Sequence, residues 1–187
     1  MKKGQVWISA VLYIALGIVA IAVVLSAGVP LINKIKDKNT IIQTKELLLS
    51  VDNIIREVRD EGPGSRRVIQ PLVIKDGNLF IIPTQNLIRW ELETSTIFTE
   101  PCGKDKDECE SKELVIKEGT MELYQLTTIV EDEYIVNLEL NYDGIGNLML
   151  ESETGKGSGL IGRYTMTIEN KGISEGKSLP DIGISAI

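Results

Sequence analysis

Residues 4–33 read GQVWISAVLYIALGIVAIAVVLSAGVPLIN and contain no charged side chain. They follow Met1, Lys2 and Lys3 directly, so the apolar stretch lies at the head of the sequence. A helix of about 20 apolar residues spans the hydrocarbon core of a bilayer, and in lipid a single segment satisfies its backbone hydrogen bonds only as a helix. We therefore expect a transmembrane helix over about residues 6–31.

A secretory signal that is removed after its apolar core is the alternative interpretation. Such signals have an apolar core of roughly 7–15 residues, followed by a cleavage site of small residues. The stretch from Val6 to Val29 is longer than that, and residues 22–27 offer only a poor cleavage site. The pattern favours a retained anchor, or a leader that is cut before the apolar stretch.

Pro30 is expected to kink or briefly interrupt the helix, which then continues as an amphipathic extension over residues 32–60. Apolar residues recur there at helical spacing, centred on Leu47, Val51, Ile54 and Val58, with Leu48 and Ile55 beside them. The opposite positions hold Lys45, Glu46, Asp52, Arg56, Glu57 and Arg59. Gly62-Pro63-Gly64 predicts the end of the helix, so we expect it over residues 5–61. Either the chain's own β-domain or neighbouring chains cover the apolar face.

From Arg66 onward, β-forming residues alternate with polar ones, and turn residues separate short strands. An Asp76-Gly77 hairpin is expected, with further turns at residues 118–120 and 143–146. The expected strands cover residues 68–74, 79–82, 87–94, 114–117, 121–130, 134–142, 147–151, 162–169 and 182–187. We predict an α+β fold in which a long N-terminal helix precedes an antiparallel β-sandwich-like globular domain, residues 62–187, or a sheet wrapped on the helix.

The charge of the chain is unevenly distributed. The formal net charge is −7, and residues 62–187 carry 12 basic and 21 acidic side chains, whereas residues 31–61 are balanced. Nucleic-acid binding depends on clustered Lys and Arg. The acidic β-domain therefore argues against nucleic acid as a partner.

Cys102 and Cys109 are the two cysteines of the chain. Two thiols without a histidine cannot complete a tetrahedral zinc site. A small-loop disulfide fits, worth about 2–3 kcal/mol in the chain-entropy model, and it indicates an oxidising, extracytoplasmic location. Two reduced thiols in a cytosolic loop are the alternative. Since lysines flank both ends of the apolar stretch, the cysteine pair decides the expected orientation, with the N-terminus inside.

A search for catalytic and cofactor motifs yields little. Histidine, the usual acid–base group and metal ligand, does not occur in the sequence. Residues 157–162 match G-x-G-x-x-G by letters, but a strand is expected to follow instead of the helix that a dinucleotide site needs. The acidic residues of the cysteine loop alternate with lysines and do not fit an EF-hand. We predict no enzyme activity, no cofactor and no metal site.

Lys2-Lys3-Gly4-Gln5, followed by a long apolar helix, resembles the class III signal peptide of type IV pilin-like proteins, in particular archaeal type IV pilins. In that family a membrane prepilin peptidase cuts after the glycine, on the cytoplasmic side. The resemblance implies that residues 1–4 are a leader, that Lys3 and Gly4 are recognised, and that Gln5 becomes the N-terminus. The position that holds Glu in bacterial pilins is Ser9 here.

The resemblance further implies that the helix first lies among membrane lipids and then packs against identical subunits in a filament core, with the help of the pilus assembly machinery. Small residues such as Gly17, Ala20 and Gly28 let neighbouring helices approach closely. The chain is thus expected to be a structural subunit of an extracellular filament for adhesion or surface attachment. The alternative is an uncleaved, single-pass membrane-anchored binding protein with an acidic extracytoplasmic β-domain.

Overall fold

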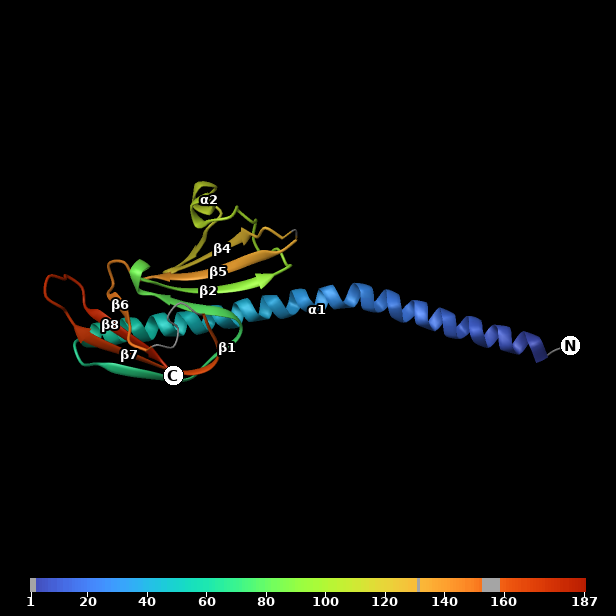
Figure 1. Ribbon diagram of the computed structural model, residues 1–187, viewed down its shortest axis with the longest axis horizontal. Helices are drawn as coiled ribbons and strands as arrows, with labels where there is room; N and C mark the ends of the chain where they lie inside the picture. The colour runs from blue at the N-terminus through green and yellow to red at the C-terminus, as the bar shows by residue number, and fades with distance from the viewer. Residues whose placement is uncertain (1–2, 131, 153–158) are drawn as a thin grey trace. The chain divides into compact units, whose positions relative to one another are not determined.

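The computed structural model describes residues 3–130, 132–152 and 159–187. A long helix precedes an 8-stranded sheet, which confirms the predicted α+β class. The chain divides into two compact units, Met1–Asn39 and Thr40–Ile187, and we call the second unit the head. In chain order the elements are α1 (Lys3–Glu61), β1 (Arg66–Ile82), η1 (Pro83–Gln85), β2 (Leu87–Thr94), α2 (Lys106–Ser111), β3 (Ile116–Glu118), β4 (Met121–Thr127), β5 (Tyr134–Asn141), β6 (Asn147–Leu150), β7 (Leu160–Gly172) and β8 (Asp181–Ala186) (Figure 1).

The sequence predicts a kink or a brief interruption at Pro30; helix α1 is continuous there, so the interruption is wrong. A proline removes one backbone hydrogen bond and crowds the preceding turn, but membrane helices tolerate it where local adjustments or neighbouring groups satisfy the freed backbone carbonyl. The helix ends where the sequence predicts. Gly62 adopts a φ of +94° and donates its N–H to the Arg59 carbonyl at 3.3 Å. Glycine reaches this left-handed conformation without strain, which explains the stop.

Within the head, the sheet covers one face of α1. The buried apolar residues of that face are Ile41, Leu48, Val51, Ile55 and Val58. Leu48 and Ile55 are fully buried, whereas Leu47 and Ile54 are only partly buried, so the buried stripe is rotated from the one that the sequence predicts. The chain's own strands therefore cover the apolar face of the helix from Ile41 onward.

Asp52, predicted on the charged face of the helix, is buried instead. Its Oδ2 accepts hydrogen bonds from Arg56 Nε at 2.9 Å and from Thr120 Oγ1 at 3.0 Å. Thr120 belongs to the turn between β3 and β4, and Glu118 at the end of β3 pairs with Lys45. These contacts hold the β3–β4 turn against the helix. Helical periodicity alone cannot reveal this burial, because the covering turn lies far along the chain.

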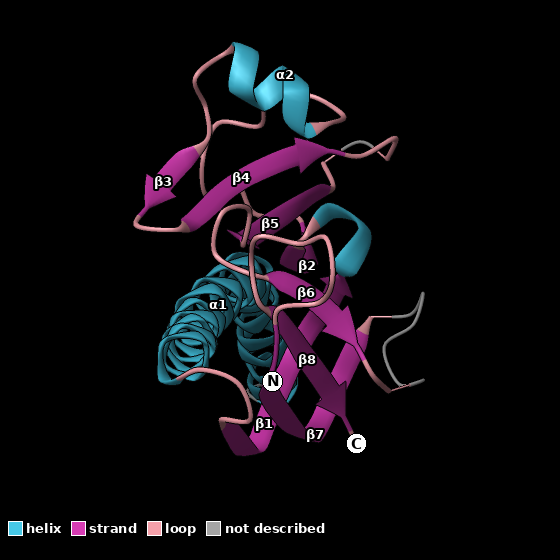
Figure 2. Ribbon diagram, turned by 90° about the vertical axis from the view of Figure 1, so that its left-hand side faces the viewer, coloured by secondary structure: helices cyan, strands magenta, loops and turns pink. Residues whose placement is uncertain are grey.

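All eight described strands belong to one sheet with the order β3-β4-β5-β2-β1-β7-β8-β6. In Figure 2, β3, β4 and α2 lie at one end of the head, and β1, β7 and β8 lie at the other. Most neighbours are antiparallel, but β6 pairs with β8 in parallel, so the wholly antiparallel arrangement predicted from the sequence is wrong. The turn after β5 does not form a hairpin because the Asn147 N–H donates to the Pro180 carbonyl at 2.8 Å, which directs β6 to the far edge.

The Asp76-Gly77 hairpin predicted from the sequence is also wrong, because β1 continues through these residues. The first part of β1 pairs with β7 and its last residues pair with β2. A register shift against β7 between Ile74 and Leu79 accommodates the extra residues as a bulge. Gly77 lies in this bulge with a φ of +76°, and Trp90 Nε1 donates to the Asp76 carbonyl at 3.1 Å. The turn signal therefore marks a bulge within a strand.

Gly77→Ala is expected to destabilise the head by about 2 kcal/mol or more, since overpacking adds to the strain of a positive φ. A Cβ at Gly77 would collide with the Glu91 carbonyl oxygen and approach the Trp90 ring to 2.8 Å. Gly119→Ala is the matched control, because its φ is +62° and nothing lies within 4 Å of an added Cβ. Chemical denaturation of the full chain should rank Gly77→Ala well below Gly119→Ala in stability; equal losses would contradict the bulge.

Candidate functional site

The first candidate site is the apolar part of α1. By length and composition, α1 could span a membrane. Within the described part of α1, large apolar side chains are exposed from Val11 to Ile35, in contrast with the buried face that begins at Ile41. Exposed apolar surface of this extent marks a surface that contacts lipid or another protein.

The predicted processing and packing residues all lie on α1. Lys3, Gly4 and Gln5 occupy its first turn, whereas Met1 and Lys2 of the predicted leader lie outside the described residues. Ala20 is exposed, and nothing lies within 4 Å of a Cβ added at Gly17 or Gly28. The surface at these glycines is therefore open to a neighbouring helix.

The second candidate site lies around the cysteine loop. Cys102 and Cys109 form a disulfide, as the sequence predicts, and both pack against Tyr124 of β4 in a small core of their own. The loop contains the helix α2, which the sequence analysis missed. Asp105 caps α2 by accepting a hydrogen bond from the Glu108 N–H at 3.0 Å. Asp105 followed three residues later by Glu108 is a capping-box pattern that could have predicted this helix.

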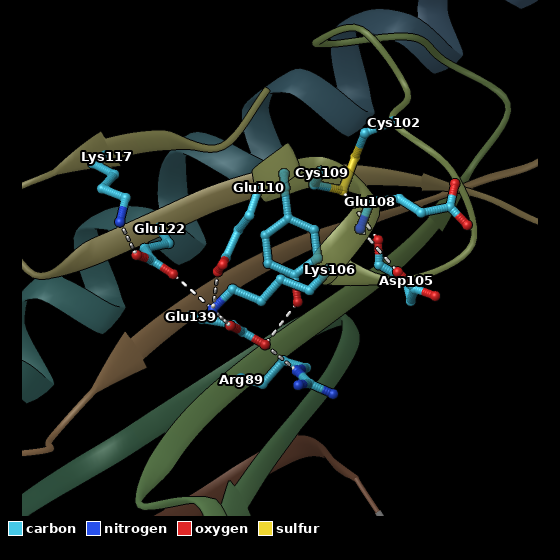
Figure 3. Close-up of polar contacts among 11 residues, drawn as sticks. Arg89, Cys102, Asp105, Lys106, Glu108, Cys109, Glu110, Lys117, Glu122 and Glu139 are labelled. Atoms are coloured by element: carbon cyan, nitrogen blue, oxygen red, sulfur yellow. Dashed lines mark hydrogen bonds and ion pairs between the residues drawn. A yellow bond between two sulfur atoms is a disulfide. The ribbon is translucent and has the colours of Figure 1, made fainter. Parts of the chain in front are cut away.

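Charged side chains from α2 and three strands meet at Glu139 of β5, which is 1% exposed (Figure 3). Glu139 Oε1 accepts from Arg89 Nε at 2.5 Å and from the Tyr124 hydroxyl at 2.7 Å. Glu139 Oε2 accepts from Lys106 Nζ at 2.7 Å. Lys106 also reaches Glu122 at 2.7 Å, and Lys117 pairs with Glu122 at 2.8 Å. We call Arg89, Lys106, Glu122, Tyr124 and Glu139 the Glu139 cluster.

The pKa values in the Glu139 cluster follow from burial and pairing. Burial opposes the negative charge of Glu139, but hydrogen bonds from Lys106 and Tyr124 and the charge of Arg89 outweigh it, so its pKa is lowered. Burial also opposes the charge of Lys106, yet its hydrogen bonds to Glu122 and Glu139 raise its pKa. Burial, followed by the hydrogen bond to Glu139, raises the pKa of Tyr124. The ionised forms of Glu139 and Lys106 are thus stabilised.

The Glu139 cluster holds the cysteine loop against the face of the sheet on which Glu122 and Glu139 lie. Lys106 begins α2 and lies between the two cysteines in sequence, while Glu122 and Glu139 are strand residues. The Cys102 N–H donates to the Gln125 carbonyl at 3.0 Å, and the Thr127 N–H donates to the Gly103 carbonyl at 2.7 Å. The cluster can therefore hold α2 in place.

The sequence contains only weak matches to metal-binding and nucleotide-binding motifs. Among the described residues, no three His, Cys, Asp or Glu side chains lie where they could hold a metal ion. Gly157 and Ser158 of the G-x-G-x-x-G match lie outside the described residues, and the strand β7 begins at Leu160. Comparison of the chain with protein-family models, curated proteins and solved structures finds no match.

Proposed function

We propose that this chain is a structural subunit of an extracellular, type IV pilus-like filament that serves adhesion or surface attachment. One observation carries the proposal. The apolar face of α1 from Ile41 onward is buried by the head's own sheet, whereas the large apolar side chains from Val11 to Ile35 are exposed. The part of α1 after Ile41 thus belongs to a folded domain, whereas the part from Val11 to Ile35 needs lipid or further helices to shield its apolar side chains from water.

The apolar part of α1 contacts membrane lipid first and the helices of other subunits afterwards. Before assembly, the apolar part of α1 holds the subunit in the cell membrane, with its N-terminus inside and the head outside. The Cys102–Cys109 disulfide supports an oxidising location for the head. In the filament, helices of identical subunits replace the lipid, and open positions such as Gly17 and Gly28 permit close packing.

Processing is the step that can be tested most directly. If Lys3-Gly4-Gln5 is a prepilin cleavage site, mature protein from its own cells begins at Gln5. Gly4→Leu should block cleavage and abolish filaments, because a bulky side chain replaces the glycine at the bond that is cut. N-terminal sequencing and sedimentation of sheared surface material provide the two measurements.

Gly17→Leu is the matched control for Gly4→Leu. It makes the same chemical change further along α1, so cleavage should proceed normally while filament packing weakens. A native chain that begins at Met1, or one that lacks the apolar helix, would contradict the proposal. A chain that stays in the membrane and never sediments as filaments would favour the alternative, an uncleaved anchored binding protein with an acidic head.

A further inference from the structure

The turn between β4 and β5 exposes apolar side chains at an end of the sheet. Ile129 is 95% exposed and Val130 is 57% exposed. The preceding strand β4 differs, because all of its side chains are buried or half-buried. Ile97 is 58% exposed in the loop after β2, and Gln125 Nε2 of β4 donates to the carbonyl of the preceding Thr96 at 2.8 Å. Exposed aliphatic residues gathered in this way indicate a contact surface.

Hydrogen bonds join the described residues of this turn. The Val130 N–H donates to Thr128 Oγ1 at 3.1 Å, and the Thr128 N–H donates to the Glu133 carbonyl at 3.2 Å. Asp132 and Glu133 are exposed next to the aliphatic pair. The turn therefore presents an apolar tip with an acidic flank, and we call residues Ile129, Val130, Asp132 and Glu133 the acidic tip.

Helix α1 presents a surface of complementary chemistry just after its uncharged stretch. Leu31 is 59% exposed and Ile35 is 53% exposed. Lys34 and Lys38 are exposed and stand four residues apart, so they lie on one side of the helix. Leu31 and Ile35 each stand three residues before one of these lysines and share their side of the helix, so we call Leu31, Lys34, Ile35 and Lys38 the basic collar.

We propose that the acidic tip of one chain docks on the basic collar of a second copy of this chain. Both surfaces are exposed in the single chain, one apolar with carboxylates and the other apolar with ammonium groups. Burial of the aliphatic side chains supplies the attraction, and the opposite charges set the register and exclude wrong partners. The acidic flank disfavours an anionic lipid surface for the tip. The inference rests on the proposed filament and names a contact between its subunits.

Charge reversal tests this contact in cells that assemble the full chain. Lys34→Glu with Lys38→Glu should lower the fraction of chain that sediments as filaments roughly tenfold, because like charges then face each other. Asp132→Lys with Glu133→Lys should do the same. Combining all four substitutions should recover most of the wild-type fraction, since the opposite charges are restored with their places exchanged.

Asp107→Lys with Glu175→Lys is the matched control, because both residues are exposed and the change in net charge is the same. Combined with the lysine reversals, this control should not recover assembly. Total chain and the intact disulfide are measured in each variant to confirm folding.

Three outcomes are distinguishable. If the wild type forms filaments and either reversed pair leaves their amount unchanged, the proposed contact is wrong. The same holds if the variant with all four substitutions does not recover assembly. In both cases the proposed filament function is not contradicted. If the lysine reversals release the chain from the membrane without affecting assembly, the collar binds lipid headgroups and the contact is wrong. If the wild type never forms filaments, the proposed function fails and the contact falls with it.

Discussion

Leu48→Ala is expected to lower the free energy of unfolding of the head by about 2–5 kcal/mol. Leu48 is fully buried on α1, where it is part of the core that includes Trp90 of β2 and Leu138 of β5. Truncation removes apolar contacts on both sides of the helix–sheet boundary and leaves a cavity that rigid strands cannot fill. Chemical denaturation of the full chain in detergent measures the loss, with Trp7 replaced by Phe in every variant so that the fluorescence reports buried Trp90 alone.

Ile42→Ala is the matched control for Leu48→Ala. Ile42 lies on the same helix within the head but is 44% exposed, so the same kind of truncation should cost less than about 1 kcal/mol. If the two variants lose stability equally, the helix presents a different face to the sheet. A small loss of stability for Leu48→Ala together with a large loss for Leu47→Ala would instead support the buried stripe that periodicity predicts.

Glu139→Gln is expected to cost about 3 kcal/mol at neutral pH, because it leaves two cations without their buried partner. The amide side chain of glutamine can still accept the hydrogen bond from the Tyr124 hydroxyl, but it carries no charge to pair with Arg89 and Lys106. The loss should be accompanied by loosening of α2, since Lys106 begins that helix. Denaturation gives the stability, and hydrogen exchange of the α2 amides gives the loosening.

The pH dependence of this effect has a defined sign. The folded pKa of Glu139 lies below its ordinary value of 4.5, so its stabilising contribution is complete above that value and is lost as the pH falls through the folded pKa. The gap between wild type and Glu139→Gln should therefore be widest near neutral pH and should close in acid. Glu93→Gln, on the neighbouring strand β2 and exposed, is the control and should change neither quantity. A gap that widens in acid would contradict the pairing.

Local sequence patterns were sufficient to predict several structural elements. Strand β2 covers Leu87–Thr94, as its alternation predicts, because two-residue periodicity matches a strand that packs by one face. The end of α1 at Glu61 follows from the glycines and proline that come next. The disulfide could be predicted because the chain has only one possible pair of cysteines.

The acidic residues illustrate where local patterns fail. Asp52 and Glu139 are each charged residues at positions that face solvent in an isolated helix or strand, and both are buried. Asp52 is covered by Thr120, 68 residues away, and Glu139 is covered by Lys106, 33 residues away. Their burial becomes favourable only when distant segments supply the hydrogen bonds and opposite charges that replace water.

By itself, the sequence determined that a membrane-length apolar helix continues into an amphipathic one and precedes an acidic, β-rich domain, because composition and short-range periodicity report directly on helix, strand and burial. Only the tertiary structure decided that β1 runs through its Asp-Gly signal, that β6 lies parallel to β8, and that α2 docks on Glu139. Each of these depends on pairing between segments far apart in the chain, where the free energy of contact outweighs the local preference of the residues involved.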